Sequence, residues 1–263
     1  MNRIIYEQYQ PEPRLQGAAH RAWRATVHAP IDDFLIVPDG CVDVLFSPNG
    51  GLQVVGTMTA AQSLSLPAAA EVVGVRLQPG AALPWLRADM AQLTNDQVPL
   101  RDMLGPTVSA LEDQLCAIGD PRHRAMALGK KISESVVSSW AEATPQAHAL
   151  QRAVAALARA DGDLSVEWLA LQSNLSTRQF QRRCRMATGL SPKRLARVFR
   201  LLRALREKAR TGASWTTIAA DCGYADQAHF SHDFTNLVGC CPGVYAERGG
   251  DVRFSQAVGT DGP

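Results

Sequence analysis

A short stretch near residue 180 carries side chains suited to binding nucleic acid. Ser176 can cap a helix that begins at Thr177, because a serine hydroxyl accepts a hydrogen bond from a free amide of the first turn. Phe180 and Cys184 lie four residues apart, which places both on the face of that helix that points to the core. Side chains that hydrogen-bond base edges and phosphates fall on the opposite face. They are Arg178, Gln181, Arg182 and Arg185.

A second stretch, residues 218–234, repeats this arrangement. A short apolar helix ends at Gly223, a residue type that tolerates the positive φ of a tight turn. In the helix that follows, Phe230 and Phe234 are four residues apart and point to the core. Two helices joined by a tight turn, the second of which enters the DNA major groove, form a helix-turn-helix. The outward side chains of this second helix are Gln227, Ala228, Ser231 and His232.

The segment between these stretches predicts a long basic helix over residues 192–211. Its apolar residues can form one stripe, and lysines and arginines occupy most of the remaining surface against a single acid, Glu207. Two interpretations of this charge stay open, a solvated helix face and contact with DNA phosphates. The position between two helix-turn-helix units favours phosphate contact. The basic residues with that expected role are Lys193, Arg194, Arg197, Arg200 and Arg203.

Residues 149–248 resemble the DNA-binding region of the AraC/XylS family of transcription regulators. The resemblance rests on residues 218–234 and on the paired endings Gly-Leu-Ser-Pro at 189–192 and Gly-Cys-Cys-Pro at 239–242. It implies two helix-turn-helix units that read successive major-groove segments of double-stranded DNA, with RNA polymerase as a further partner of an activator. It assigns base readout to Arg178, Gln181, Arg182, Gln227, Ala228 and His232. Backbone contacts fall to Ser176, Arg185, Ser231 and the basic residues of the linker helix named above.

The second unit departs from the family pattern in its charge. No Lys or Arg lies between Arg210 and Arg248. His232 and Thr235 stand where the family usually has Arg and Lys. Because phosphates attract cations, we expect the first unit and the basic helix to dominate the affinity for DNA.

The first half of the chain predicts a small β-barrel or sandwich. β-branched runs alternate with turns rich in Gly, Pro, Asn and Asp, and they occupy residues 34–37, 41–46, 52–55 and 72–77. From residue 81 the pattern becomes helical, with helices expected at 104–118 and 123–140, and Pro145 predicts a linker at 144–148. The predicted fold class is α+β, with a β-rich first domain that ends in helices, an all-α domain of two helix-turn-helix units, and a mobile tail. These parts span residues 1–143, 149–248 and 249–263.

Residues 38–46 and 73–81 resemble a cupin-like sensor domain that precedes some regulators of this family. The resemblance implies that the domain binds a small-molecule effector, forms a homodimer, or does both. Cupin enzymes hold metal with clustered histidines, and this region offers only His20 and His28, so neither a metal nor another cofactor is expected. Effector pockets combine apolar walls with a few polar groups. Five residues are candidates for such a pocket, although residues of these types are more often ordinary core or surface: Trp23, Phe34, Asp43, Arg76 and Trp85.

The overall charge of +2 conceals an asymmetry between the two halves of the chain. Residues 1–147 carry a net charge of −4 and the remainder a net charge of +6, so one half is expected to meet a polyanion. No apolar run approaches the roughly 20 residues of a membrane-spanning helix, and the N-terminus lacks the pattern of a signal peptide. We therefore expect a cytoplasmic protein without a membrane partner.

Enzymatic chemistry is not expected, because the chain has no phosphate-binding loop, nucleophile elbow or paired catalytic carboxylates. The leading hypothesis is an effector-controlled transcription regulator. An architectural DNA-binding protein without an effector is the alternative. A DNA-repair protein with an alkyl-acceptor cysteine is a weaker one. That chemistry needs several clustered cysteines, and residues 1–147 supply only Cys41 and Cys116.

Overall fold

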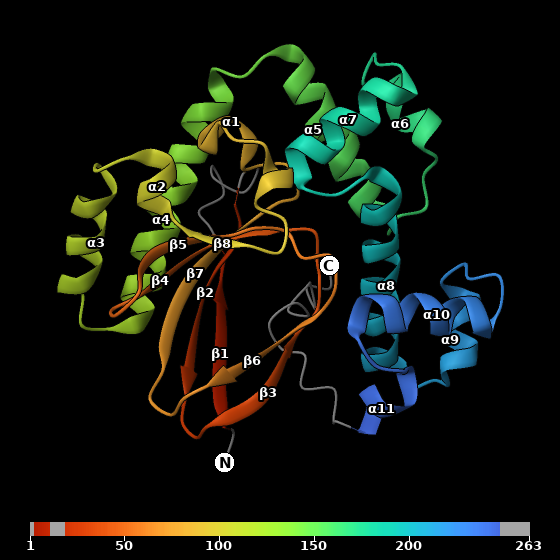
Figure 1. The fold of residues 1–263 in the computed structure, drawn as a ribbon, viewed down its shortest axis with the longest axis horizontal. Coiled ribbons are helices and arrows are strands. Elements are labelled where there is room, and N and C mark those ends of the chain that lie inside the picture. The colour runs from red at the N-terminus through yellow and green to blue at the C-terminus, as the bar shows by residue number, and fades with distance from the viewer. Residues whose placement is uncertain (1–2, 11–18, 248–263) are drawn as a thin grey trace.

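The computed structural model describes residues 3–10 and 19–247, and the first half of this chain is built on antiparallel strands (Figure 1). Six strands form one sheet in the order β1-β2-β7-β4-β5-β8, and β3 pairs with β6 in a second sheet. The predicted β-rich region is confirmed, although only β3, β4, β5 and β7 overlap the predicted runs. The strands are β1 Ile4–Tyr9, β2 Ala19–Val27, β3 Ile31–Ile36, β4 Val42–Ser47, β5 Gly51–Val55, β6 Gln62–Leu66, β7 Glu71–Leu77 and β8 Gln97–Pro99.

Helices cover the six-stranded sheet on one side, and the longest of them lies along β2 and β7. Gly129 of that helix permits the close approach, because an added Cβ would lie 2.8 Å from the Cβ of Ala22. The Nε1 of Trp140, near the end of the same helix, donates to the carbonyl oxygen of Ala81 over 2.9 Å. The elements of this layer are α1 Leu83–Leu86, the 3₁₀ helix η2 Met90–Gln92, α2 Leu100–Leu104, α3 Val108–Ala117 and α4 Pro121–Ala141.

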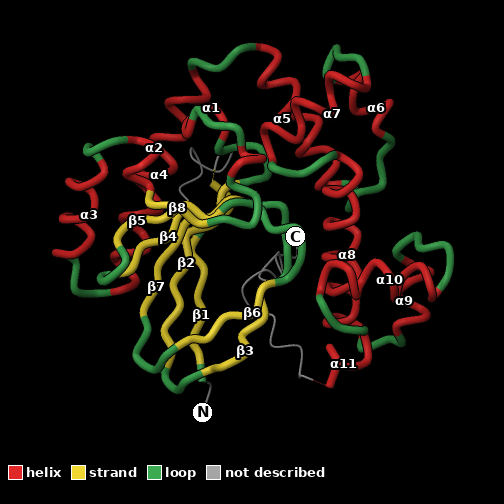
Figure 2. Tube along the Cα trace, viewed as in Figure 1, coloured by secondary structure: helices red, strands yellow, loops and turns green. Residues whose placement is uncertain are grey.

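The second half is helical, and Figure 2 separates it clearly from the strands. A long helix, α8, runs between the pair α6/α7 and the pair α9/α10, as the sequence predicted. Several of these helices begin at a serine or aspartate whose side chain accepts a backbone N–H three residues on, which satisfies one free amide of the first turn. The helices are α5 Pro145–Arg159, α6 Val166–Gln172, α7 Thr177–Thr188, α8 Pro192–Thr211, α9 Trp215–Asp221, α10 Gln227–Val238 and α11 Pro242–Glu247.

Two details of the helical prediction are wrong. The linker expected at 144–148 belongs to α5, because Thr144 caps that helix and Pro145 occupies its first turn, where a missing N–H is harmless. The single helix expected at 104–118 is broken, because Gly105 ends α2 at a φ of +75° and α3 begins only at Val108. Gly105 therefore marks the end of a helix, whereas Pro145 marks the start of one.

The two halves of the chain pack against each other. Val37, which follows β3, belongs to the hydrophobic core of the helical half. Gly40 lies against α8, where an added Cβ would come within 2.7 Å of the Cδ1 of Leu195. The Nε2 of Gln151 in α5 donates to the carbonyl oxygen of Pro79 over 3.0 Å. These contacts fix the helical half beside the sheets.

Within residues 3–10 and 19–247, no helix combines the length and the apolar character needed to cross a bilayer.

Candidate nucleic-acid interface

Helix α7 is the first of the two helices that the sequence predicts to read DNA, here called the reading helices, and it begins with a capping box. The amide of Gln179 donates to the Oγ of Ser176 over 3.3 Å, and the Oε1 of Gln179 accepts from the amide of Ser176 over 3.0 Å. Phe180 and Cys184 are fully buried, as predicted from their spacing. The opposite face therefore points to solvent. It carries Arg178, Gln181, Arg182 and Arg185, all of which are exposed.

Replacing Ser176 with alanine is expected to destabilise the protein by about 1 kcal/mol, because it removes the cap of α7 and leaves an amide of the first turn without a partner. Urea unfolding of the full chain measures the change. Ser138→Ala, an exposed substitution within α4, is the matched control and should leave stability nearly unchanged. Equal stability of the two variants would contradict the assigned cap.

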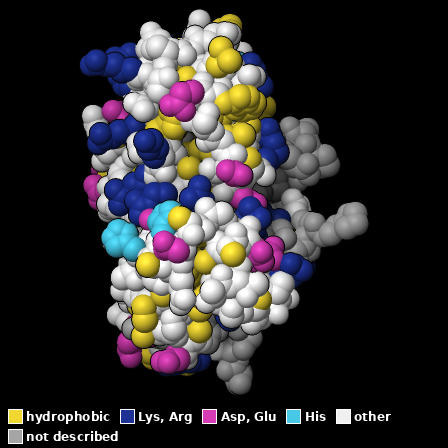
Figure 3. All heavy atoms as spheres, turned by 90° about the vertical axis from the view of Figure 1, so that its right-hand side faces the viewer, with side chains coloured by type: hydrophobic (Ala, Val, Ile, Leu, Met, Phe, Trp, Pro, Cys, Tyr) yellow, Lys and Arg dark blue, Asp and Glu magenta, His cyan; other side chains and the backbone are white. Residues whose placement is uncertain are grey.

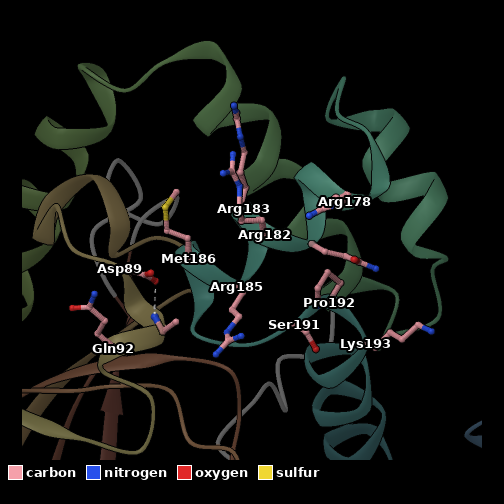
Figure 4. Close-up of a pocket in the computed structure, with 12 residues that line it drawn as sticks. Asp89, Gln92, Arg178, Arg182, Arg183, Arg185, Met186, Ser191, Pro192 and Lys193 are labelled. Atoms are coloured by element: carbon pink, nitrogen blue, oxygen red, sulfur yellow. Dashed lines mark hydrogen bonds between the residues drawn. The ribbon is translucent and has the colours of Figure 1, made fainter.

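A groove of about 1180 Å³ runs along α7, the start of α8 and η2 (Figure 4). The helical half contributes most of the charged residues that line this groove. Asp89 and Gln92 line the groove from the N-terminal half. Arg183, half-buried on α7, also lines the groove and was missed by the sequence analysis, which placed only the outermost face of the helix. The excess of cations makes this groove attractive to a polyanion. Its basic residues are Arg178, Arg182, Arg183, Arg185 and Lys193.

The second reading helix, α10, presents a neutral face. Gln227, Ala228 and His232 are exposed, and Ser231 is half-buried. The Oε1 of Gln227 accepts from the hydroxyl of Thr216 over 3.3 Å, and His232 contacts the amide nitrogen of Asn236. Figure 3 shows Lys and Arg side chains gathered over the upper and middle part of this side of the molecule, with histidine at the edge of that belt.

Several basic residues of α8 make contacts within the protein. Arg197 forms an ion pair with the buried Asp233 of α10 at 2.6 Å. Arg203 donates to the carbonyl oxygen of Asp221 over 2.9 Å, and the guanidinium of Arg200 lies 5.5 Å from the ring centre of Tyr224. These contacts hold α8 against the second helix-turn-helix unit. Arg197, Arg200 and Arg203 were expected to contact DNA phosphates, and each would have to give up a contact within the protein to do so. Arg194 also makes a contact within the protein, since it donates to the carbonyl oxygen of Thr59 in the N-terminal half. Lys193, by contrast, has no hydrogen-bond or ion-pair partner among residues 3–10 and 19–247.

Four of the five effector candidates line one cavity of about 170 Å³, enclosed by strands of both sheets. They are Trp23, Phe34, Asp43 and Arg76. The fifth, Trp85, belongs to α1 and is buried in the core shared by the six-stranded sheet and its helices, and it does not line this cavity. The walls are otherwise mainly apolar, which the alternation of inward side chains along paired strands explains.

A buried ionic cluster forms the polar end of the cavity. The guanidinium of Arg76 lies 3.2 Å from a carboxylate oxygen of Asp39 and 3.2 Å from one of Asp43. The Nε1 of Trp23 donates to the other oxygen of Asp43 over 3.1 Å, which places the indole across Gly74. Burial raises the pKa of Asp43, and the neighbouring Asp39 carboxylate adds to this effect against the opposing influence of Arg76. Burial alone would lower the pKa of Arg76, but the two carboxylates raise it above its ordinary value.

Comparison with known proteins finds a different family model that matches part of each half. Residues 169–248 match the model described as a helix-turn-helix domain, and residues 7–99 match one described as a domain of unknown function (DUF6597). The HTH-type transcriptional activator RhaS of Pectobacterium atrosepticum is 38% identical over 79 residues, which are 29% of this chain and 28% of that protein. RhaS of Escherichia coli O157:H7 is 40% identical over 68 residues, which are 25% and 24% of the two chains. The chain thus spans only about a quarter of the length of these curated relatives.

Solved structures that match this chain include two of ToxT from Vibrio cholerae. ToxT of strain O395 is 12% identical with a TM-score of 0.39, over 92% of this chain and 96% of ToxT. Wild-type ToxT of strain SCE256 bound to an unsaturated fatty acid is 15% identical with a TM-score of 0.38, over 92% and 94% of the two chains.

Proposed function

This chain carries a helix-turn-helix domain of the AraC/XylS family at residues 169–248, and on that premise we propose that it is a sequence-specific DNA-binding transcription regulator. The observation that carries the proposal is the solvent face of α7. Arg178 and Arg182 are exposed there, and neither makes a hydrogen bond or ion pair with any residue of the described ranges 3–10 and 19–247. Arginine on a helix in the major groove reads guanine through two hydrogen bonds.

Backbone binding belongs, in this proposal, to the groove beside α7. Arg185 and Lys193 are exposed and would meet phosphates on either side of the reading helix. Ser176 supports binding by fixing the start of α7, because the capping box engages both its hydroxyl and its backbone amide. Gln227, Ala228 and His232 offer hydrogen bonds and apolar contact but no charge. The first unit therefore supplies most of the affinity, and the second supplies a subsidiary reading of sequence.

Control by a small molecule is the second part of the proposal, with the cavity between the two sheets as the binding site. It combines apolar walls with one buried polar cluster, the composition typical of ligand sites. Trp23, Phe34, Asp43 and Arg76 are the residues that would contact the effector. Trp85 is left out of the site, because it does not line the cavity.

The experiment that tests the proposal compares DNA from upstream of the protein's own gene and its neighbours with shuffled DNA of the same composition. Fluorescence anisotropy should show binding to one natural fragment at least about 10³-fold tighter than to shuffled DNA. Binding to both should weaken steeply as salt rises from about 50 to 200 mM, because phosphate contacts release counterions. Equal affinity for all fragments at every salt concentration would favour the architectural alternative over a sequence-specific regulator.

A further inference from the structure

One loop of the N-terminal half touches the C-terminal ends of both reading helices. We call residues 56–61, between β5 and β6, the bridging loop. The hydroxyl of Thr57 donates to the carbonyl oxygen of Thr188, the last residue of α7, over 2.7 Å. The amide of Ala61 donates to the carbonyl oxygen of Leu237, in the last turn of α10, over 2.7 Å. The last carbonyl groups of a helix have no partner within it, so a single loop satisfies such groups on both helices.

Further contacts join the same region to the DNA-binding half. The Nη2 of Arg194, in the first turn of α8, donates to the carbonyl oxygen of Thr59 over 3.2 Å. The hydroxyl of Thr94 donates to the carbonyl oxygen of Gly189, which follows α7, over 3.1 Å. At Gly189 the φ is +79° and an added Cβ would lie 2.8 Å from that hydroxyl, so the approach needs glycine. The bridging loop therefore contacts the end of α7, the start of α8 and the end of α10.

The bridging loop is itself held in place from the other side. The Oδ1 of Asn95 accepts from the amide of Thr59 over 2.7 Å, and the amide of Asn95 donates to the carbonyl oxygen of Thr57 over 3.0 Å. An added Cβ on Gly56 would lie 1.7 Å from the carbonyl oxygen of Leu93, so the backbones meet too closely for any side chain. With both faces engaged, the loop can transmit a displacement from one helix to the other.

Alternate residues of this segment face different neighbours. Gly56, Met58 and Gln62 line the cavity between the sheets, whereas Thr57, Thr59 and Ala61 contact the DNA-binding half. Thr57 makes its contact through its side chain, whereas Thr59 and Ala61 make theirs through a backbone carbonyl oxygen and a backbone amide. A molecule in the cavity would thus press on residues that are direct chain neighbours of those that bond both reading helices.

We propose that the bridging loop sets the position of α7 relative to α10, and that occupancy of the cavity alters this position through the loop. Thr57 and Ala61 are positioning residues in this scheme, since both lie in the bridging loop and would act on DNA only through the reading helices. The link to DNA rests on the proposed function, but the mechanical link between the two helices does not.

Hydrogen exchange of the full chain, without DNA, tests that mechanical link. Thr57→Val removes the hydroxyl that bonds α7 and keeps the shape of the buried side chain. If the loop connects the helices, exchange should quicken about five-fold or more in peptides at the end of α10 as well as at the end of α7, the effect of losing one hydrogen bond. Faster exchange confined to α7 would overturn the proposal.

Ala61→Pro provides the reciprocal test, because it removes the N–H that bonds Leu237 at a half-buried position. It should quicken exchange at the end of α7, which Ala61 does not touch, and it decides the question if Thr57→Val fails to fold. Thr107→Val is the matched control. The hydroxyl of Thr107 bonds only the nearby carbonyl of Leu104, so both reading helices should exchange as in the wild type. Faster exchange at the reading helices in this control would also count against the proposal.

Binding to a cognate site in which base pairs are inserted between the two half-sites tests the consequence at DNA. The wild-type chain should lose affinity with each inserted base pair, and Thr57→Val and Ala61→Pro should tolerate insertions better. Identical tolerance in all three proteins would overturn the positioning role. Absence of any specific DNA binding would instead count against the proposed function and leave the exchange result standing.

Discussion

Arg76→Met is expected to destabilise the protein by about 3–5 kcal/mol, because it leaves the carboxylates of Asp39 and Asp43 buried without their counterion. The side chains of the three residues are only 7%, 8% and 15% exposed, so water cannot replace the lost guanidinium. Methionine fills a similar volume, which keeps a cavity term out of the comparison. Urea unfolding followed by circular dichroism measures the loss.

The double variant Arg76→Met with Asp43→Asn separates charge from packing. Removing one of the two carboxylates that have lost their counterion should recover part of the lost stability, since a neutral amide costs less to bury than an unpaired charge. Wild-type stability of Arg76→Met would mean that the cluster contributes nothing to folding. A double variant less stable than the single one would contradict this prediction, because asparagine keeps an oxygen that can accept from the Nε1 of Trp23 and the further loss would have to come from the missing charge of Asp43.

Joint replacement of Arg178 and Arg182 by alanine should weaken binding to the cognate site by about 2–6 kcal/mol, since each arginine that reads a base contributes about 1–3 kcal/mol. The corresponding loss of affinity is about 30-fold to 10⁴-fold. Binding to shuffled DNA should fall much less, so discrimination between the two sequences should largely disappear. Anisotropy titrations at fixed salt measure both affinities.

Lys130→Ala with Lys131→Ala is the control for this prediction, because it removes the same charge from exposed positions on α4, far along the chain from the reading helices. Discrimination between cognate and shuffled DNA should survive in the control. An equal loss on both DNAs in the double arginine variant would reduce Arg178 and Arg182 to phosphate contacts.

The reading helices were predictable because their information is local. A serine cap, two buried residues four positions apart and a glycine at the end determine where α7 begins, which face it buries and where it stops. The same residues determine which arginines point outward. Arg183 escaped prediction because a groove between elements, rather than the face of its own helix, decides its surroundings.

The basic helix α8 shows where charge patterning misleads. Its arginines were predicted to contact phosphates because they lie between two helix-turn-helix units, but Arg197 pairs with Asp233 and Arg203 bonds the carbonyl of Asp221. Both partners lie more than a turn of helix away in sequence and belong to the next unit. Only the packing of α8 against α9 and α10 brings them within reach, and no spacing rule encodes it.

Local patterns in the sequence therefore sufficed to predict the helix-turn-helix units, the cap of α7 and the outward side chains, because hydrogen bonding over three or four residues and the helical period depend on neighbouring positions. Tertiary structure alone decided that Trp23, Phe34, Asp43 and Arg76 enclose one cavity while Trp85 does not, and that residues 56–61 join both reading helices. Those relations depend on strand pairing, register and the contact between two separate cores, which bring together residues that are tens of positions apart along the chain.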